Sequence, residues 1–118
     1  MSRNCKAAVL VVWTAVCYPA AAAGYTPLKC AMAVTAAERT ICASYSLGQA
    51  EARMASLYQW ATSFVAMGQR GAIQDDQITF IKKREGCGAN TKCIQGVYDA
   101  RIKQLEAVMD NVKRHGPF

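Results

Sequence analysis

The chain has 118 residues, which is enough for one domain. It carries 14 Lys and Arg against 8 Asp and Glu, a formal net charge of +6. No apolar run approaches the roughly 20 residues of a membrane-spanning helix, so we expect neither a spanning segment nor a membrane anchor. The moderate positive charge comes without a basic-aromatic motif, which favours acidic partners or anionic polymers over nucleic acid.

Residues 1–23 have the layout of a cleaved signal peptide. Arg3 and Lys6 supply a positive start, and an apolar run of about ten residues follows. Pro19 interrupts that run, and the alanines at 21–23 supply the small residues that a signal peptidase needs. We therefore expect a mature domain at 24–118, with 12 Lys and Arg against 8 Asp and Glu. A buried N-terminal helix is the alternative, but the order of these features favours the signal peptide.

A lipid anchor would need a cysteine directly after a small residue at the end of the apolar run. Cys17 follows Val16, and Cys30 follows Lys29, so neither cysteine meets this condition. The sequence therefore predicts a protein without a lipid anchor. Together with the predicted export signal, this places the protein in the periplasm or outside the cell.

The mature chain begins with a lead-in that contains Pro27, and one helical turn is expected around Cys30. Thr35 and Glu38 have the spacing of a capping box, in which the two side chains each accept a backbone N–H at the start of a helix. We therefore expect a short helix that continues to about Ser44.

The next segment shows a clear amphipathic pattern. Ser46 and Gln49 form a second candidate capping box, which predicts a helix start there. Gly68 and Gly71 predict the end of this helix. Its apolar side chains recur at spacings of three and four, as on one helix face: Leu47, Ala50, Met54, Leu57, Tyr58, Ala61, Phe64 and Val65.

Two further helices are predicted in the second half of the chain. Asp75 and Asp76 suit the positive end of a helix dipole and predict a start, and Gly86 predicts the end. The longest periodic run follows Cys93 and reaches about Lys113, where basic residues, Gly and Pro stop it. No segment shows sustained period-two alternation, so the predicted fold is all-α, a small three- to four-helix bundle.

Cleavage of the signal peptide would leave four cysteines, which in a short exported chain indicate a disulfide framework. Four cysteines allow three pairings. Pairing of neighbours along the chain is favoured because it closes short loops at helix junctions, while cross-pairing between the two halves stays open. The four are Cys30, Cys42, Cys87 and Cys93.

Catalytic and metal-binding patterns are weak. The chain has no C-x-x-C motif and no close cysteine pair of the zinc-binding type. His115 is the only histidine and lies near the end of the chain. Asp75 and Asp76 are adjacent, but a helix start explains them without catalysis. We therefore expect no enzymatic activity, no metal site and no cofactor.

Six polar side chains are candidates for an internal network or for a binding groove. Arg84 and Arg101 fall on or beside apolar helix faces, where a charge usually needs a partner. The favoured interpretation pairs either arginine with Glu38 or Glu51 inside the bundle, with two tyrosine hydroxyls completing the hydrogen bonds. In the alternative, the arginines face a groove and hold an anionic glycan or a carboxylate. The six are Glu38, Glu51, Tyr58, Arg84, Tyr98 and Arg101.

Three blocks of sequence cover nearly the whole mature chain. The first contains Cys30, residues 36–42, Leu47, Glu51 and Tyr58; the second contains Gln77, Phe80, Ile81, Arg84, Glu85 and Cys87; the third contains Cys93, Tyr98, Arg101, Ile102 and Leu105. In this order they resemble the LprI-like N-terminal domain, a secreted domain family named after a lysozyme-inhibiting lipoprotein. The family usually has Trp at the position of Phe80 and Asp at that of Glu51.

The resemblance implies a small secreted helical domain and, for function, inhibition of a lysozyme-type hydrolase. The first hypothesis is therefore an exported, non-enzymatic binding protein whose partner is a protein of the envelope, with lysozyme as the candidate. The alternative is a structural or interaction module of the cell envelope that binds protein or an anionic cell-wall polymer such as peptidoglycan. Trp60 lies off the main apolar face, where it would either anchor a partner or cover an edge of the bundle.

Overall fold

The computed structural model describes residues 27–116. A short 3-10 turn, η1 (Cys30–Met32), precedes four helices: α1 (Ala36–Ala43), α2 (Tyr45–Phe64), α3 (Met67–Gly86) and α4 (Thr91–His115). There is no strand between Pro27 and Gly116, so the predicted all-α bundle is confirmed. The predicted signal peptide at 1–23 and its cleavage point lie outside the described residues.

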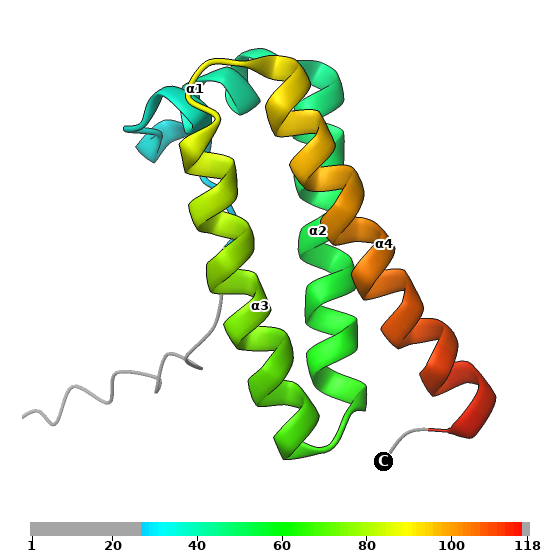
Figure 1. Ribbon diagram of the computed structural model, residues 1–118. Helices are drawn as coiled ribbons and strands as arrows, with labels where there is room; N and C mark the ends of the chain where they lie inside the picture. Colours follow the sequence, from blue (N-terminus) through cyan, green and yellow to red (C-terminus); the bar gives the residue numbers. More distant parts are fainter. Residues whose placement is uncertain (1–26, 117–118) are drawn as a thin grey trace, which may run out of the picture.

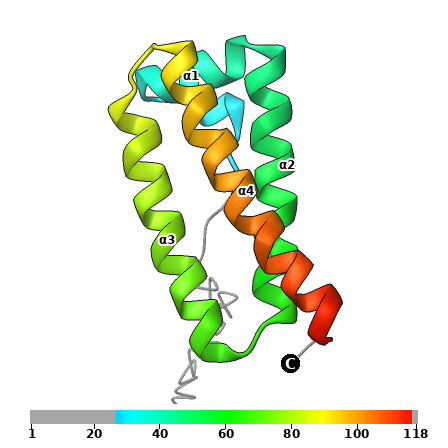
Figure 2. The same ribbon diagram turned by 45° about the vertical axis from the view of Figure 1, so that its right-hand side comes forward.

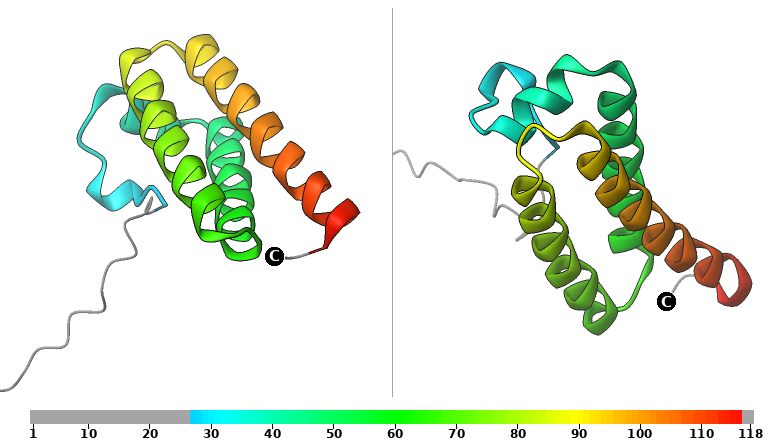
Figure 3. Two further views of the ribbon diagram at one scale, coloured as in Figure 1. Left: turned by 60° about the horizontal axis from the view of Figure 1, so that its bottom comes forward. Right: turned by 45° about the horizontal axis from the view of Figure 1, so that its top comes forward.

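The three long helices form the body of the bundle, and α1 lies across one end of it (Figure 1). Both α2 and α4 run away from that end, and α3 returns towards it. Of all the helix pairs, α2 and α4 pack together most extensively. Seen from the side, η1 and α1 close the end where α3 turns into α4 (Figure 2). The tilted views in Figure 3 show the same cap against the ends of all three long helices.

The start of α1 follows the predicted capping box. The Thr35 Oγ1 atom accepts the Glu38 N–H at 3.1 Å, and Glu38 Oε2 accepts the N–H groups of Val34 and Thr35 at 2.7 and 3.1 Å. These bonds satisfy backbone donors that have no partner within the helix. A capping box is a short-range pattern, and here the spacing of Thr35 and Glu38 alone was sufficient to predict the start of the helix.

The predicted cap of α2 at Ser46 is wrong. The N-cap is Ser44, whose Oγ accepts the Leu47 N–H at 3.3 Å, and Ser46 already lies in the first turn. Ser44 also ends α1, because its backbone is extended (φ −112°, ψ 121°) and its N–H donates to the carbonyl of Ile41. One residue therefore separates two helices, which places Leu47 in the core.

The predicted boundary between α2 and α3 is also wrong. Only Val65 and Ala66, both extended, connect the helices, and Gly68 and Gly71 lie inside α3. Helical glycine costs about 1 kcal/mol relative to alanine, and burial of α3 against its neighbours offsets this. Because Val65 is itself buried, the connection packs against the core and needs no flexible residue.

The turn between α3 and α4 is close to the prediction. The end of α3 at Gly86 is confirmed, and Gly88 follows with a positive φ of 56°, a conformation that favours glycine. Asn90, which the sequence pattern did not single out, is the N-cap of α4, and its Oδ1 accepts the Cys93 N–H at 3.0 Å. The helix therefore begins at Thr91, so that Cys93 lies within its first turn.

Two disulfides join neighbours along the chain, as favoured. Cys30 pairs with Cys42, with their Cα atoms 5.6 Å apart, and Cys87 pairs with Cys93, with theirs 5.5 Å apart. The first ties η1 to the end of α1, and the second closes the α3–α4 turn. Disulfides persist in oxidising compartments, which agrees with export. Within residues 27–116, no helix is long and apolar enough to cross a membrane.

Cap substitutions test the corrected helix start. Ser44→Ala should lower the free energy of unfolding by about 1 kcal/mol, because the Leu47 N–H loses its acceptor. Ser46→Ala is the matched control and should stay within about 0.5 kcal/mol of the parent. Urea unfolding followed by circular dichroism measures both values. A larger loss for Ser46→Ala than for Ser44→Ala would contradict the assignment.

Candidate functional site

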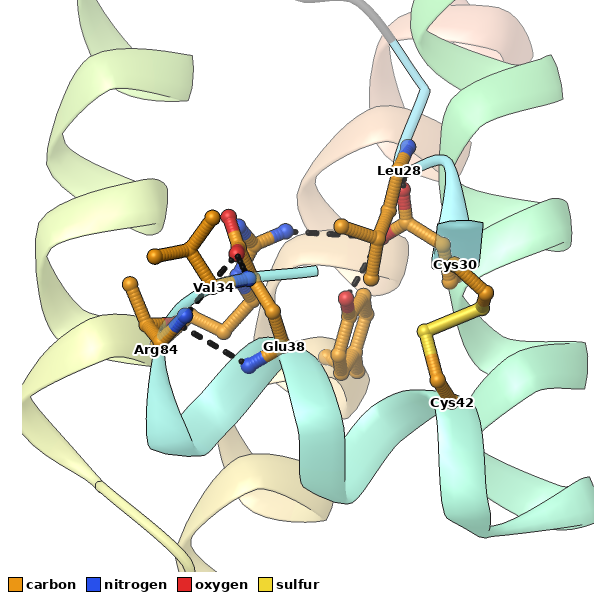
Figure 4. Close-up of a disulfide and its surroundings, with 9 residues drawn as sticks. Leu28, Cys30, Val34, Glu38, Cys42 and Arg84 are labelled. Carbon is orange, nitrogen blue, oxygen red and sulfur yellow. Dashed lines mark hydrogen bonds and ion pairs between the residues drawn. A yellow bond between two sulfur atoms is a disulfide. The ribbon is translucent and has the colours of Figure 1, made fainter. Parts of the chain in front are cut away.

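Glu51 of α2 lies at the centre of a buried polar network beneath the α1 end of the bundle. Its Oε1 accepts the backbone N–H of Leu28 at 3.0 Å, and its Oε2 accepts the hydroxyl of Tyr98 at 2.5 Å. The same Oε2 lies 3.7 Å from Nη1 of Arg84. A single carboxylate thus connects the N-terminal segment, α2, α3 and α4. Figure 4 shows Leu28 beside the Cys30–Cys42 disulfide, with Arg84 on the opposite side of Leu28.

Arg84 enters the network from the last turns of α3. Its Nε and Nη2 donate to Oε1 of Glu85 at 3.1 and 2.9 Å, and its guanidinium lies 5.9 Å from the centre of the Phe80 ring. Nη1 has no hydrogen-bond acceptor and depends on the Glu51 charge. Burial lowers the pKa of Arg84, but the oxygens of Tyr98, Glu85 and Glu51 outweigh it, so the pKa is raised overall.

Tyr98 completes the network from α4. Its ring packs edge-to-face against Phe80, with ring centres 5.2 Å apart, and its side chain is fully buried. Burial and the neighbouring Glu51 carboxylate raise the pKa of the Tyr98 hydroxyl well above its usual range. The hydroxyl therefore stays protonated and donates to the carboxylate at every physiological pH.

A second polar layer lies further along the bundle, around Arg101 of α4. Its Nε donates to Oε1 of Gln77 at 2.8 Å, and its Nη2 donates to the carbonyl of Ile73 at 3.0 Å. Nη1 reaches Gln104 at 3.2 Å, and the Gln77 amide in turn donates to the sulfur of Met54 at 3.2 Å. Burial lowers the pKa of Arg101, although the Asp76 charge opposes this. Arg101 thus joins α4 to α3 without a glutamate.

Of the remaining two candidates, Glu38 lies outside the network because its carboxylate caps α1. The N–H groups of Val34 and Thr35 lower its pKa. Tyr58 is buried in α2, where burial raises its pKa and the charge of Arg101 opposes the rise. The structure therefore brings together Glu51, Arg84 and Tyr98, and it places Arg101 at the centre of the second layer, where its charge acts on Tyr58.

Sequence reasoning missed several members of these layers, among them Gln77 and the backbone groups of Leu28 and Ile73. In the sequence, Gln77 stands out only as one of the residues that carry the family resemblance. The backbone groups of Leu28 and Ile73 carry no signal in side-chain patterns. The available clue was that Gln77 occupies a core position, because a buried side-chain amide needs a hydrogen-bond partner such as an arginine. Of the two arginines expected to pair with Glu38 or Glu51, Arg84 lies beside Glu51, whereas Arg101 donates to Gln77 and to the carbonyl of Ile73.

Hollows on the surface of residues 27–116 include the following three. One groove, of about 450 Å³, runs between α3 and α4. A second, of about 390 Å³, lies between the N-terminal segment, α1 and α2, and has Glu51 among its lining residues. A third, of about 410 Å³, lies beside Trp60 and Phe64 on α2. Between residues 27 and 116, no three His, Cys, Asp or Glu side chains are grouped as metal ligands.

No family model, curated protein or solved structure matches this chain. The resemblance to the LprI-like domain therefore stays a prediction from the residues quoted above.

Removal of one network partner should be costly. Glu51→Ala removes the acceptor of the Tyr98 hydroxyl and of the Leu28 N–H. It also leaves Arg84 with Glu85 as its one remaining ion-pair partner among residues 27–116, so it should cost about 3–5 kcal/mol of unfolding free energy. The double variant Glu51→Leu/Arg84→Met removes both charges and should be more stable than Glu51→Ala. Denaturant unfolding of the parent, Glu51→Leu, Arg84→Met and the double variant gives the coupling energy. Additive losses would show that the two side chains do not depend on each other.

Stability should fall at high pH because of Tyr98. Its folded pKa is raised, so the folded protein keeps the proton that the unfolded chain loses above about pH 10. The contribution of Tyr98 to the free energy of unfolding is therefore fully present below that pH. It falls as the pH rises further, by up to about 1.4 kcal/mol per pH unit for one group. Tyr98→Phe should flatten this slope, whereas Tyr45→Phe, an exposed control, should not. Unfolding midpoints measured from about pH 9 to about pH 11 provide the comparison.

Proposed function

We propose that this protein is an exported, non-enzymatic binding protein that acts by surface contact with a protein partner. The sequence resemblance supplies a lysozyme-type hydrolase as the candidate partner. The observation that supports contact with a protein is an exposed apolar patch, which we define as Trp60 and Phe64. The exposed Met67 follows at the start of α3. The patch lies where α2 ends and α3 begins, at the end of the bundle remote from the disulfides.

The patch has the composition of a protein-binding surface. Trp60 is 56% exposed and stacks on Phe64, with ring centres 5.5 Å apart and planes 22° from parallel. Met67 is 84% exposed at the first position of α3. Tryptophan and methionine are enriched at interfaces, and tryptophan often carries a large share of the binding energy. Phe64 is partly buried against the core, which holds the Trp60 ring in place.

The non-enzymatic part of the proposal rests on how the reactive side chains are used. Both carboxylate oxygens of Glu51 accept protein donors. The four mature cysteines are in disulfides, which leaves no thiolate nucleophile among them. His115 is exposed near the end of α4, and its Nδ1 lies 3.0 Å from the carbonyl of Asn111. These groups hold the bundle together or lie apart from one another.

The positive charge of the mature chain decides what kind of contact is available. A basic hydrolase would be repelled at long range, so electrostatic steering would not assist the encounter. Binding would then depend on short-range burial of the apolar patch. An acidic hydrolase, or an anionic polymer, would instead be attracted by the 12 Lys and Arg against 8 Asp and Glu.

A lysis assay tests the proposal. Purified protein with both disulfides should slow the clearing of a cell-wall suspension by lysozyme. Trp60→Ala should weaken this inhibition about tenfold or more, because the centre of the patch is lost. Tyr45→Ala is the matched control, since it removes an exposed aromatic ring on the same helix at the opposite end of the bundle. Its potency should equal that of the parent.

The same preparation distinguishes the alternative function. If micromolar excess does not slow lysis, the hydrolase proposal is wrong. Sedimentation with isolated sacculi that added salt reverses would then support an envelope module that binds an anionic polymer through its positive charge. If the protein neither slows lysis nor sediments with sacculi, both proposals are excluded.

A further inference from the structure

The groove between α3 and α4 exists because two side chains on α4 are small. Lys92, Gly96, Ala100 and Gln104 follow at intervals of four residues and form one row along the helix. Gly96 contributes no side chain and Ala100 only a methyl group, so the middle of the row is open. A Cβ atom built on Gly96 would contact nothing within 4 Å. The result is an open space of about 450 Å³.

The middle of this groove is apolar. Val97 of α4 and Phe80 of α3 line it between the two helices, beside the gap that Gly96 and Ala100 leave. Phe80 is held by its edge-to-face contact with Tyr98 and by the guanidinium of Arg84, so its position is set by the buried network. The apolar surface is therefore preformed, as in most sites that bind small molecules.

The two ends of the groove differ in charge. At one end the negative charge of Asp76 stabilises the charged form of Arg101, so these two charges offset each other. At the other end, next to the α3–α4 turn, lie Lys83 and Lys92. Neither lysine has a hydrogen bond or an ion pair to any residue from 27 to 116. The uncompensated positive charge is thus confined to one end.

We propose that this groove binds a medium-chain carboxylate, whose alkyl chain lies over Val97 in the gap at Gly96 and Ala100 and whose carboxylate meets Lys83 and Lys92. This site does not depend on the proposed contact with a hydrolase, because the apolar patch lies elsewhere on the molecule. The length also fits. Asp76 and Lys83 are seven positions apart in α3, about 10 Å along the helix axis, which suits a short alkyl chain.

Other ligand classes match the groove less well. An inorganic anion would use the lysines but leave the apolar middle in contact with water. An uncharged hydrocarbon would cover the middle and leave both lysines without a partner. A volume of about 450 Å³ lies within the range of small-molecule sites, and apolar walls with a few convergent polar groups are their usual lining.

Titration with octanoate, monitored by amide NMR shifts below the micelle-forming concentration, tests the site. We expect saturable shifts centred on Gly96, Val97 and Ala100. Octanol should bind about three- to tenfold more weakly, since it lacks the charge that two exposed lysines attract, and octylammonium more weakly still. From hexanoate to decanoate, affinity should rise about three- to fivefold per two methylenes, because a half-open groove removes only part of the chain from water.

Substitutions with matched controls complete the test. Gly96→Leu should abolish octanoate binding by filling the gap, whereas Gly71→Leu, at another open helical glycine, should not change it. Lys83→Gln/Lys92→Gln should weaken binding about three- to tenfold, whereas Lys103→Gln/Lys113→Gln, outside the groove, should not. Circular dichroism verifies that each variant is folded.

Three results would overturn the assignment. The first is equal binding of octanoate and octylammonium, which would show that the lysines play no part. The second is shifts centred on Trp60 or on the α1–α2 groove instead of Gly96. The third is the absence of any saturable shift at millimolar octanoate. Because the readout is octanoate binding and not lysis, failure here leaves the proposed hydrolase contact untouched, and failure of the lysis assay leaves this site untouched.

Discussion

The arrangement of this bundle depends on one buried carboxylate. Glu51 accepts hydrogen bonds from the backbone of the N-terminal segment and from Tyr98, and it is the counter-charge of a guanidinium that otherwise has an unsatisfied nitrogen. Charges removed from water are stabilised only when their partners are correctly placed, so α2, α3 and α4 have little freedom to shift relative to one another. The polar layer selects one packing of three amphipathic helices that hydrophobic burial alone would leave less well defined.

The two disulfides act at the same end of the molecule as this network. One holds η1 against the end of α1, and the other closes the turn from which α4 starts. Each constrains a segment that adjoins a network residue: Leu28 precedes Cys30, and Arg84 precedes Cys87. The end of the bundle where α2 meets α3 has no such constraint and carries the apolar patch instead. The disulfides and the polar network thus lie at one end of the bundle, and the exposed apolar patch lies at the other.

The sequence predicted those features best in which the interacting residues are close together along the chain. Thr35 and Glu38 are three residues apart, and their capping box was predicted correctly. The helix end at Gly86 was likewise a local signal. Ser44 was missed because it ends one helix and caps the next, and Ser46 offered the same chemistry two residues later. Gly68 and Gly71 were taken as a helix end because their cost in a helix is local, whereas the burial that offsets it comes from packing of α3 against α2 and α4.

By itself the sequence determined the helical class, the pairing-competent cysteines and the set of polar residues on apolar faces, because each follows from spacing within one segment. Only the tertiary structure decided which polar residues meet. Arg84 reaches Glu51 and Arg101 reaches Gln77, and both choices depend on the rotation and offset of helices packed side by side. It also decided that Gly96 and Ala100 face Phe80 across a groove. Such contacts join residues distant in sequence, and their geometry is set by the packing of whole helices, which no local pattern records.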